Sequence, residues 1–160
     1  MTIRSIYLTP AQINRINAAA EAAYPTEACG LITGRLTKSS ILVVTRVVEA
    51  QNILASKATD RFEIDPATRI SLEKDIRGTN EQLIAHYHSH PDNPAQPSST
   101  DLENTHEPEL VWIIVSVMAG KATNMTAHRV IDGASGFEAI NLLTVKPSNV
   151  STISQINLDS

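Results

Sequence analysis

The sequence predicts an α/β fold in which a mixed β-sheet carries helices on both faces. Short apolar segments alternate with helical ones in the order β-α-ββ(β)-α-β-α-βββ, which is the pattern of a sheet covered by helices. The segment 110–118 (Leu-Val-Trp-Ile-Ile-Val-Ser-Val-Met) is almost continuously apolar, as expected for a strand covered on both faces. The expected helices begin with recognisable capping residues, which separates them from the strands.

Capping patterns mark the start of each expected helix. The three helices are expected over residues 10–24, 66–77 and 99–105. Thr9 precedes Pro10, and Asp65 precedes another proline, so each pair supplies an N-cap followed by proline at the first helical position. Ser98 and Asp101 fit the Ser-x-x-acid capping pattern. The third helix therefore carries Asp101 in its first turn.

Apolar and β-branched segments between these helices supply the expected strands. They cover residues 3–8, 27–36, 41–48, 61–64, 81–90, 110–118, 125–131 and 137–145. The segment 41–48 is strongly β-branched and is expected to be central in the sheet. Gly30 lies inside a strand, where glycine marks a close approach of the backbone to another group. Residues 52–58 are expected to form a loop, and residues 120–121 and 132–136 to form turns.

Length and composition predict one domain over residues 1–146, followed by a mobile polar tail over 147–160. The chain has 160 residues, 42% apolar and 19% charged, which is ordinary for a globular protein. The net charge of −4, with both signs interspersed, gives no basic footprint for nucleic acid. We expect no membrane segment, because no apolar run approaches the ~20 residues of a span. The single cysteine, Cys29, excludes an internal disulfide and fits a cytoplasmic location.

The stretch His88-Ser89-His90-Pro91 is the most informative in the chain. It ends an apolar run, so on a strand both imidazoles project from the same face. Pro91 ends that strand because it has no amide hydrogen to donate. A proline-rich loop follows and can fold Asp101 back toward the two histidines. Two imidazoles and one carboxylate suit zinc, and three protein ligands leave a fourth position open for water.

Such a metal site needs two further groups for hydrolysis. A carboxylate base must lie near the attacking water, and a donor must stabilise the oxyanion that forms. Ser98 is near Asp101 in the sequence and could be that donor, although an N-cap serine needs no catalytic explanation. The base must come from another part of the chain.

The spacing His-Ser-His-Pro-x6-Ser-x-x-Asp resembles the signature of the JAMM (MPN-plus) zinc metallopeptidases. The segment 25–32 (Pro-Thr-Glu-Ala-Cys-Gly-Leu-Ile) is similar to the family's upstream glutamate segment. The resemblance implies one zinc ion per chain held by His88, His90 and Asp101, with Glu27 as catalytic base and Ser98 as oxyanion donor. It also implies hydrolysis of a peptide or isopeptide bond. The implied fold is the JAMM/MPN fold, a mixed curved sheet of cytidine-deaminase-like architecture, with Gly30 leaving room beside the substrate.

The short chain and its Glu-Ala-Cys-Gly-Leu-Ile run look like the bacterial stand-alone members of this family. Several of these act on small ubiquitin-like sulfur carrier proteins. The resemblance therefore implies a ubiquitin-like substrate with an extended C-terminal tail. Two alternatives stay open: a JAMM peptidase of phage-tail type, and a non-catalytic MPN scaffold that only binds partners. The oligomeric state also stays open between monomer and homodimer.

Two neighbouring residues favour structural roles. His86 continues the alternation of His88 and His90 but lies outside the ligand motif, so we expect it to pack beside the site. Cys29 lies two residues after Glu27, and we expect a small buried hydrophobic side chain rather than a nucleophile. Trp112 lies in the apolar run 110–118 and is expected in the core.

Overall fold

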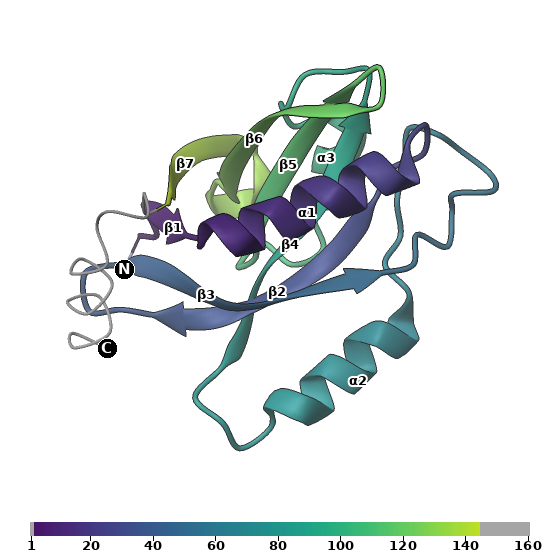
Figure 1. Ribbon diagram of the computed structural model, residues 1–160. Helices are drawn as coiled ribbons and strands as arrows, with labels where there is room; N and C mark the ends of the chain where they lie inside the picture. The colour runs from purple at the N-terminus through teal and green to yellow at the C-terminus, as the bar shows by residue number, and fades with distance from the viewer. Residues whose placement is uncertain (1, 145–160) are drawn as a thin grey trace.

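The structure is a computed structural model that describes residues 2–144 (Figure 1). Its strands are β1 (Ser5–Tyr7), β2 (Cys29–Leu36), β3 (Ile41–Ala50), β4 (Gln82–Pro91), β5 (Val111–Met118), β6 (Lys121–Val130) and β7 (Phe137–Leu143). Its helices are α1 (Pro10–Ala23), α2 (Pro66–Ile76) and α3 (Ser99–Glu103), with a short 3-10 helix at Asp132–Ala134. The predicted α/β class is confirmed. None of the helices among these residues is long and apolar enough to cross a membrane.

The strands form one mixed sheet. Neighbours pair in the order β1-β3-β2-β4-β5-β6-β7, and β7 also pairs with β1, so the pairing order closes on itself. The pairs β1–β3, β1–β7 and β4–β5 are parallel, and the others are antiparallel. The parallel pairing of β4 with β5 requires a crossover, and that crossover contains α3. The crossover between these two parallel strands therefore also carries Asp101.

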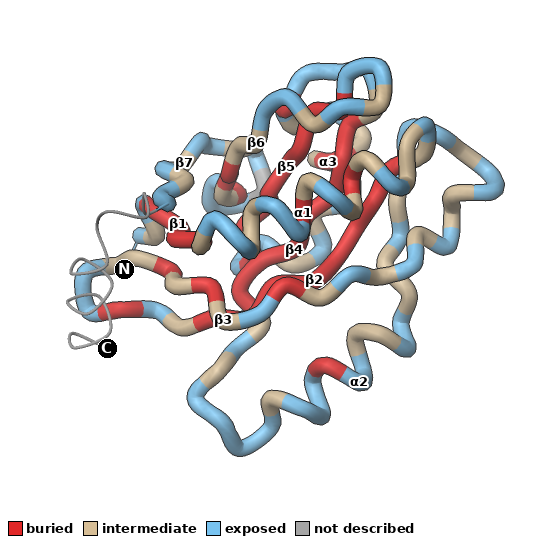
Figure 2. The backbone as a smooth tube through the Cα atoms, viewed as in Figure 1, coloured by how far each residue is buried: buried red, intermediate tan, exposed pale blue. Residues whose placement is uncertain are grey.

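Helix α1 packs along the sheet and contacts β3, β4, β5 and β6 (Figure 1). Its predicted start is confirmed, because Thr9 and Gln12 form a reciprocal capping box. Ile16 and Ala20, one turn apart, are fully buried against the strands. Helix α2 buries only Leu72 and lies apart from α1, below β2 and β3 in the view of Figure 2.

The core lies between α1 and the central strands, which Figure 2 shows as the main buried region. All seven residues from Val111 to Val117 are buried, so the prediction of a strand covered on both faces is confirmed. A Cβ atom at Gly30 would lie 2.2 Å from the ring of Tyr87 and 2.5 Å from the carbonyl oxygen of Val48. The expected close approach of another group to the backbone at Gly30 is therefore confirmed. The implied role of Gly30, to leave room beside the substrate, is wrong. β2 pairs with β3 and β4 on its two sides, and Gly30 makes room for Tyr87 rather than for a substrate.

Several expected elements differ from the structure, most clearly three of them. The segment 61–64 is not a strand: only Ile64 forms a bridge, to Asn52. The segment pairs with residues 51–53 over this single bridge, and the side chain of Asn52 bonds to the backbone of residues 61 and 63 beside it. β6 begins at Lys121 rather than near residue 125, and the expected turn at 132–136 contains the 3-10 helix. The expected tail over residues 147–160 lies outside the described residues.

Candidate metal centre

The end of β4 and the start of α3 bring His88, His90 and Asp101 together. The histidines occupy alternate positions of β4 and face the same side, as predicted, with their Nε2 atoms 2.9 Å apart. One carboxylate oxygen of Asp101 lies 3.1 Å from His88 Nε2, and the other lies 3.3 Å from His90 Nε2. All three residues are buried. The three predicted ligand residues thus present their donor atoms to one point.

The spacing of these donor atoms suits a small divalent metal ion. Their ligand atoms all lie within 4.8 Å of one another. Two ligand atoms ~2.05 Å from a tetrahedral zinc ion would stand about 3.3 Å apart. The two Nε2 atoms are 2.9 Å apart, and each lies 3.1 or 3.3 Å from one of the two oxygens of Asp101. Two imidazoles and one carboxylate are ligands that zinc accepts. The three side chains therefore fit a metal ion without rearrangement of the backbone.

Neighbouring groups hold the two imidazoles in place. His90 Nδ1–H donates to the carbonyl oxygen of Pro94 at 2.9 Å, which leaves the lone pair of Nε2 free to face a metal. The ring of Phe62 stacks on His88 with centroids 4.4 Å apart and planes inclined by 18°. His88 is fully buried under this ring. The proline-rich loop and Phe62 thus determine the orientation of the two histidines.

Asp101 is held by the predicted capping box of α3. Ser98 N donates to an oxygen of Asp101 at 2.7 Å, and Asp101 N donates to Ser98 Oγ at 3.1 Å. Burial alone would raise the pKa of Asp101, but hydrogen bonds to His88 and His90 hold it well below its usual range. The helix start therefore presents an ionised carboxylate to the two imidazoles.

Glu27 lies in the short connection before β2, and its side chain is only 5% exposed. Its Oε2 atom has no hydrogen-bond partner among residues 2–144. Burial raises the pKa of Glu27 to about 8; the charge of His90 acts in the opposite direction, and the charges of Asp101 and Asp60 raise it further. A carboxyl group of this kind is poised to exchange protons near neutral pH.

The backbone around Glu27 is attached to β4, the strand that carries His88 and His90. Ser89 lies between the two histidines in β4, and its Oγ accepts from Ala28 N at 2.8 Å. Ser89 N donates to the carbonyl oxygen of Ala28 at 3.0 Å. On the other side, Asn52 Nδ2 donates to the carbonyl oxygen of Glu27 at 3.0 Å. Sequence reasoning missed the roles of Ser89 and Asn52, since each depends on a contact between distant segments.

A cavity of about 530 Å³ opens over this arrangement. Glu27, His90 and Ser98 line it together with Asp60. A second cavity, of about 390 Å³, includes Phe62 and His86 among its lining residues. The segment that contains residues 59–63 therefore contributes to both cavities.

The other residues singled out in the sequence lie close to the site. His86 is buried, and its ring meets that of Trp112 edge-on with centroids 4.2 Å apart. Burial, followed by the charge of His88, lowers the pKa of His86 to about 3, so this ring stays neutral. Trp112 is 3% exposed, as predicted for a core residue. Cys29 is buried as predicted, and burial raises its pKa to about 12, which excludes a ready thiolate.

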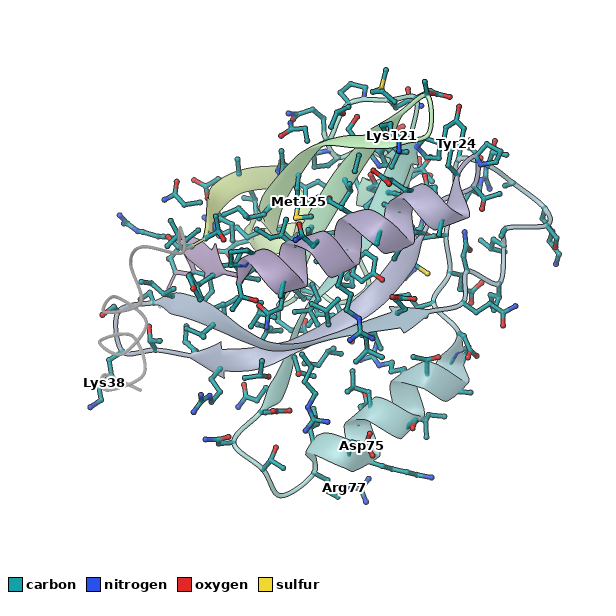
Figure 3. All side chains as sticks on the ribbon, in the orientation of Figure 1. Tyr24, Lys38, Asp75, Arg77, Lys121 and Met125 are labelled. Atoms are coloured by element: carbon teal, nitrogen blue, oxygen red, sulfur yellow. The ribbon has the colours of Figure 1, made fainter. Side chains whose placement is uncertain are left out.

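Two hydrogen bonds to the exposed side chain of Asp92 hold the rim of the cavity. Figure 3 shows Tyr24 at the end of α1, on the same side of the molecule as Lys121. Tyr24 Oη donates to a carboxylate oxygen of Asp92 at 2.7 Å, and Ala119 N donates to the other oxygen at 2.8 Å. Asp92 directly follows β4 and lines the cavity. The end of α1 and the loop after the histidines are thus joined.

Replacing Glu27 by glutamine is expected to change how the stability of the metal-free protein depends on pH. The pKa of Glu27 is raised from 4.5 to about 8 on folding. Its contribution to stability is therefore fully present below about pH 4.5 and is lost as the pH rises through 8. One pKa unit corresponds to ~1.4 kcal/mol. The free energy of unfolding of the variant, relative to that of the wild type, should therefore rise by a few kcal/mol between pH 5 and pH 8.5.

Urea unfolding of both chains at these two pH values, in the presence of a chelator, measures this difference. Both proteins contain the same histidines and the same other carboxylates. The titration of those groups therefore cancels when the stabilities of the two proteins are subtracted. A stability difference that is the same at pH 5 and pH 8.5 would mean that Glu27 is not held in its protonated form by burial.

Comparison with known proteins gives consistent matches. The model of a family described as prokaryotic homologs of the JAB domain matches residues 9–131. A desampylase of Haloferax volcanii is 32% identical over 104 residues, which are 65% of this chain and 69% of the relative. A CysO-cysteine peptidase of Mycobacterium tuberculosis is 25% identical over 131 residues, 82% of this chain and 86% of the relative. The solution structure of DSY2949 from Desulfitobacterium hafniense, 28% identical, superimposes with a TM-score of 0.75 over 88% of this chain and 93% of the other.

Proposed function

This chain belongs to the family of prokaryotic homologs of the JAB domain, and we propose that it is a zinc metallopeptidase. The proposed reaction is hydrolysis of a peptide or isopeptide bond at the C-terminus of a ubiquitin-like protein. The observation that carries the proposal is one buried set of two imidazoles and a carboxylate, with Glu27 and Ser98 facing the same cavity as His90.

His88, His90 and Asp101 would hold one zinc ion per chain. When bound, zinc supplies a Lewis acid that activates water and polarises the carbonyl group under attack. The Pro94 carbonyl keeps the proton of His90 on Nδ1, and the capping box keeps Asp101 turned inward. These contacts prepare the ligand set before an ion arrives, which favours a rigid site.

Glu27 would act as the base and then as the acid. Its carboxylate takes a proton from the attacking water and passes it to the amine that leaves. Ser98 Oγ accepts from Asp101 N, so its own hydrogen remains available to donate to the oxyanion. Capping of α3 and stabilisation of the oxyanion are therefore compatible in one serine.

The names of two relatives and the sequence motif support the proposed substrate class. One relative is named a desampylase and another a CysO-cysteine peptidase, and the JAMM resemblance implies ubiquitin-like sulfur carriers. A carrier's extended C-terminal tail would reach the cavity that contains Glu27. We also propose that residues 1–146 form one catalytic domain, a curved sheet with helices on both faces as in the JAMM/MPN fold.

The test uses a ubiquitin-like sulfur carrier with a short C-terminal extension after Gly-Gly, and the same carrier joined to a lysine side chain. The zinc-loaded protein is incubated with each substrate, and the masses of the products are measured by mass spectrometry. We expect a carrier shortened to Gly-Gly, and no product when a chelator is present. Metal binding without cleavage of either substrate would overturn the substrate class. Failure to bind metal would leave the scaffold as the better function.

A further inference from the structure

Asn52, two residues after the end of β3, uses its whole side-chain amide in hydrogen bonds. Nδ2 donates to the carbonyl oxygens of Glu27, at 3.0 Å, and Arg61, at 3.1 Å. Oδ1 accepts from the amides of Leu54, at 3.0 Å, and Glu63, at 3.1 Å. An asparagine amide offers two donors and an acceptor oxygen with two lone pairs, so all four positions are filled. A half-buried side chain this fully bonded holds its neighbours in one arrangement.

The four bonds join two parts of the proposed site. Three of them shape the segment 53–63, in which Asp60 lines the first cavity and Phe62 covers His88. The fourth reaches the backbone of Glu27, whose carboxyl group faces the same cavity. Asn52 does not belong to the ligand set, and it does not line either cavity. It therefore acts on the site only through other residues.

The backbone next to Glu27 is also attached on the side of β4. Ser89 in β4 bonds to both the amide and the carbonyl group of Ala28. The backbone at Glu27 and Ala28 is thus bonded on one side to β4, through Ser89, and on the other side to Asn52, which also holds the segment 53–63. A shift of the segment 53–63 would be transmitted to the backbone of Glu27 through the bond from Asn52.

We infer that Asn52 is a positioning residue whose bond to the Glu27 carbonyl couples the cavity wall formed by residues 53–63 to the position of the catalytic base. The catalytic role of Glu27 in this inference rests on the proposed function. The coupling between residues 53–63 and Glu27 is a property of the protein without substrate. A misplacement of a reacting group by about 1 Å costs on the order of 10²-fold in rate. Partial loosening should therefore cost about tenfold in kcat.

Asn52→Asp separates the donor bonds from the acceptor bonds. Aspartate can still accept from Leu54 N and Glu63 N, but it cannot donate to Glu27 or Arg61, and it places a charge against two carbonyl oxygens. Asn52→Ala removes all four bonds. Lys57→Ala is the matched control, because Lys57 is exposed on the same segment. We expect kcat of Asn52→Asp to fall about tenfold, with KM within twofold and one zinc ion per chain, and Lys57→Ala to match the wild type.

Amide hydrogen exchange gives a readout that needs no activity. In Asn52→Asp we expect faster exchange in peptides that cover residues 25–29 as well as in those that cover 53–63. Faster exchange in 53–63 alone, or a rise in KM with kcat unchanged, would overturn the coupling and leave Asn52 as a loop residue. If the wild type cleaves nothing but exchange changes in both segments, the proposed function fails while the coupling stands. If Asn52→Ala does not fold, Asn52→Asp decides the outcome.

Discussion

Glu27→Gln is expected to lower kcat about 10²–10⁴-fold while the protein keeps one zinc ion per chain. Glutamine has almost the same shape as the glutamate but cannot take a proton from water. Glu27 does not belong to the ligand set of His88, His90 and Asp101, so metal content should be unchanged. Steady-state kinetics combined with metal analysis of the same samples measures both quantities.

The pH dependence sharpens this test. The base must be ionised to act, and burial raises its pKa to about 8, so kcat/KM should rise with pH on the acid side of the profile. A bound divalent cation shifts that limb to lower pH by favouring the carboxylate. The limb should be absent in Glu27→Gln. Glu103→Gln, the same substitution at an exposed position of α3, should keep the wild-type profile. Near-normal turnover in the metal-loaded Glu27→Gln would show that another group is the base.

The sequence predicted the cluster of His88, His90 and Asp101 because the arrangement of these residues depends on local rules. Alternation along a strand puts His88 and His90 on one face, and a capping box turns Asp101 inward at the start of α3. Both rules act over a few residues, so they can be recognised without knowledge of the fold. Pro91 ended β4 where its missing amide hydrogen requires it.

The position of Glu27 and of the residues that hold it depends on contacts between distant segments. Glu27 was found only through the resemblance to a known family, since it is far from His88 in the sequence and nothing local distinguishes it from a surface carboxylate. Asn52 lay in a segment expected to be a loop, and the bonds of its side chain could not be inferred from any spacing. The segment 61–64 alternates like a strand but forms only one bridge, and the side chain of Asn52 bonds to its backbone on both sides of Phe62.

Phe62 shows how a misassigned segment can hide a functional contact. As part of a strand it would have counted as one more core residue. In the structure its ring lies on His88 and also within 5.9 Å of the ring centroid of His86. The side chain that closes the site over the histidines comes from a segment without regular structure, where periodicity carries no information.

Removal of the metal is expected to abolish activity and to lower Tm by roughly 10 °C. An ion that binds only the folded chain stabilises it by about 4 kcal/mol when its free concentration is 1,000 times Kd. For a domain of this size, each kcal/mol corresponds to about 2–4 °C in Tm. Because the three ligands are buried and brought together only by folding, the unfolded chain should bind zinc far more weakly. Thermal unfolding with added zinc and with a chelator measures the shift.

Asp101→Asn distinguishes the role of Asp101 as a metal ligand from its role in capping α3. Its amide oxygen can still accept from Ser98 N, so α3 should keep its start, whereas the charged ligand is lost. We expect its Tm to be similar with zinc and with chelator, and close to that of the chelated wild type. A variant whose Tm still responds to zinc would place the ion elsewhere in the protein. If the Tm of the wild type does not change with zinc either, the two histidines and the aspartate within 4.8 Å of one another hold no metal. The chain would then be better explained as a scaffold than as an enzyme.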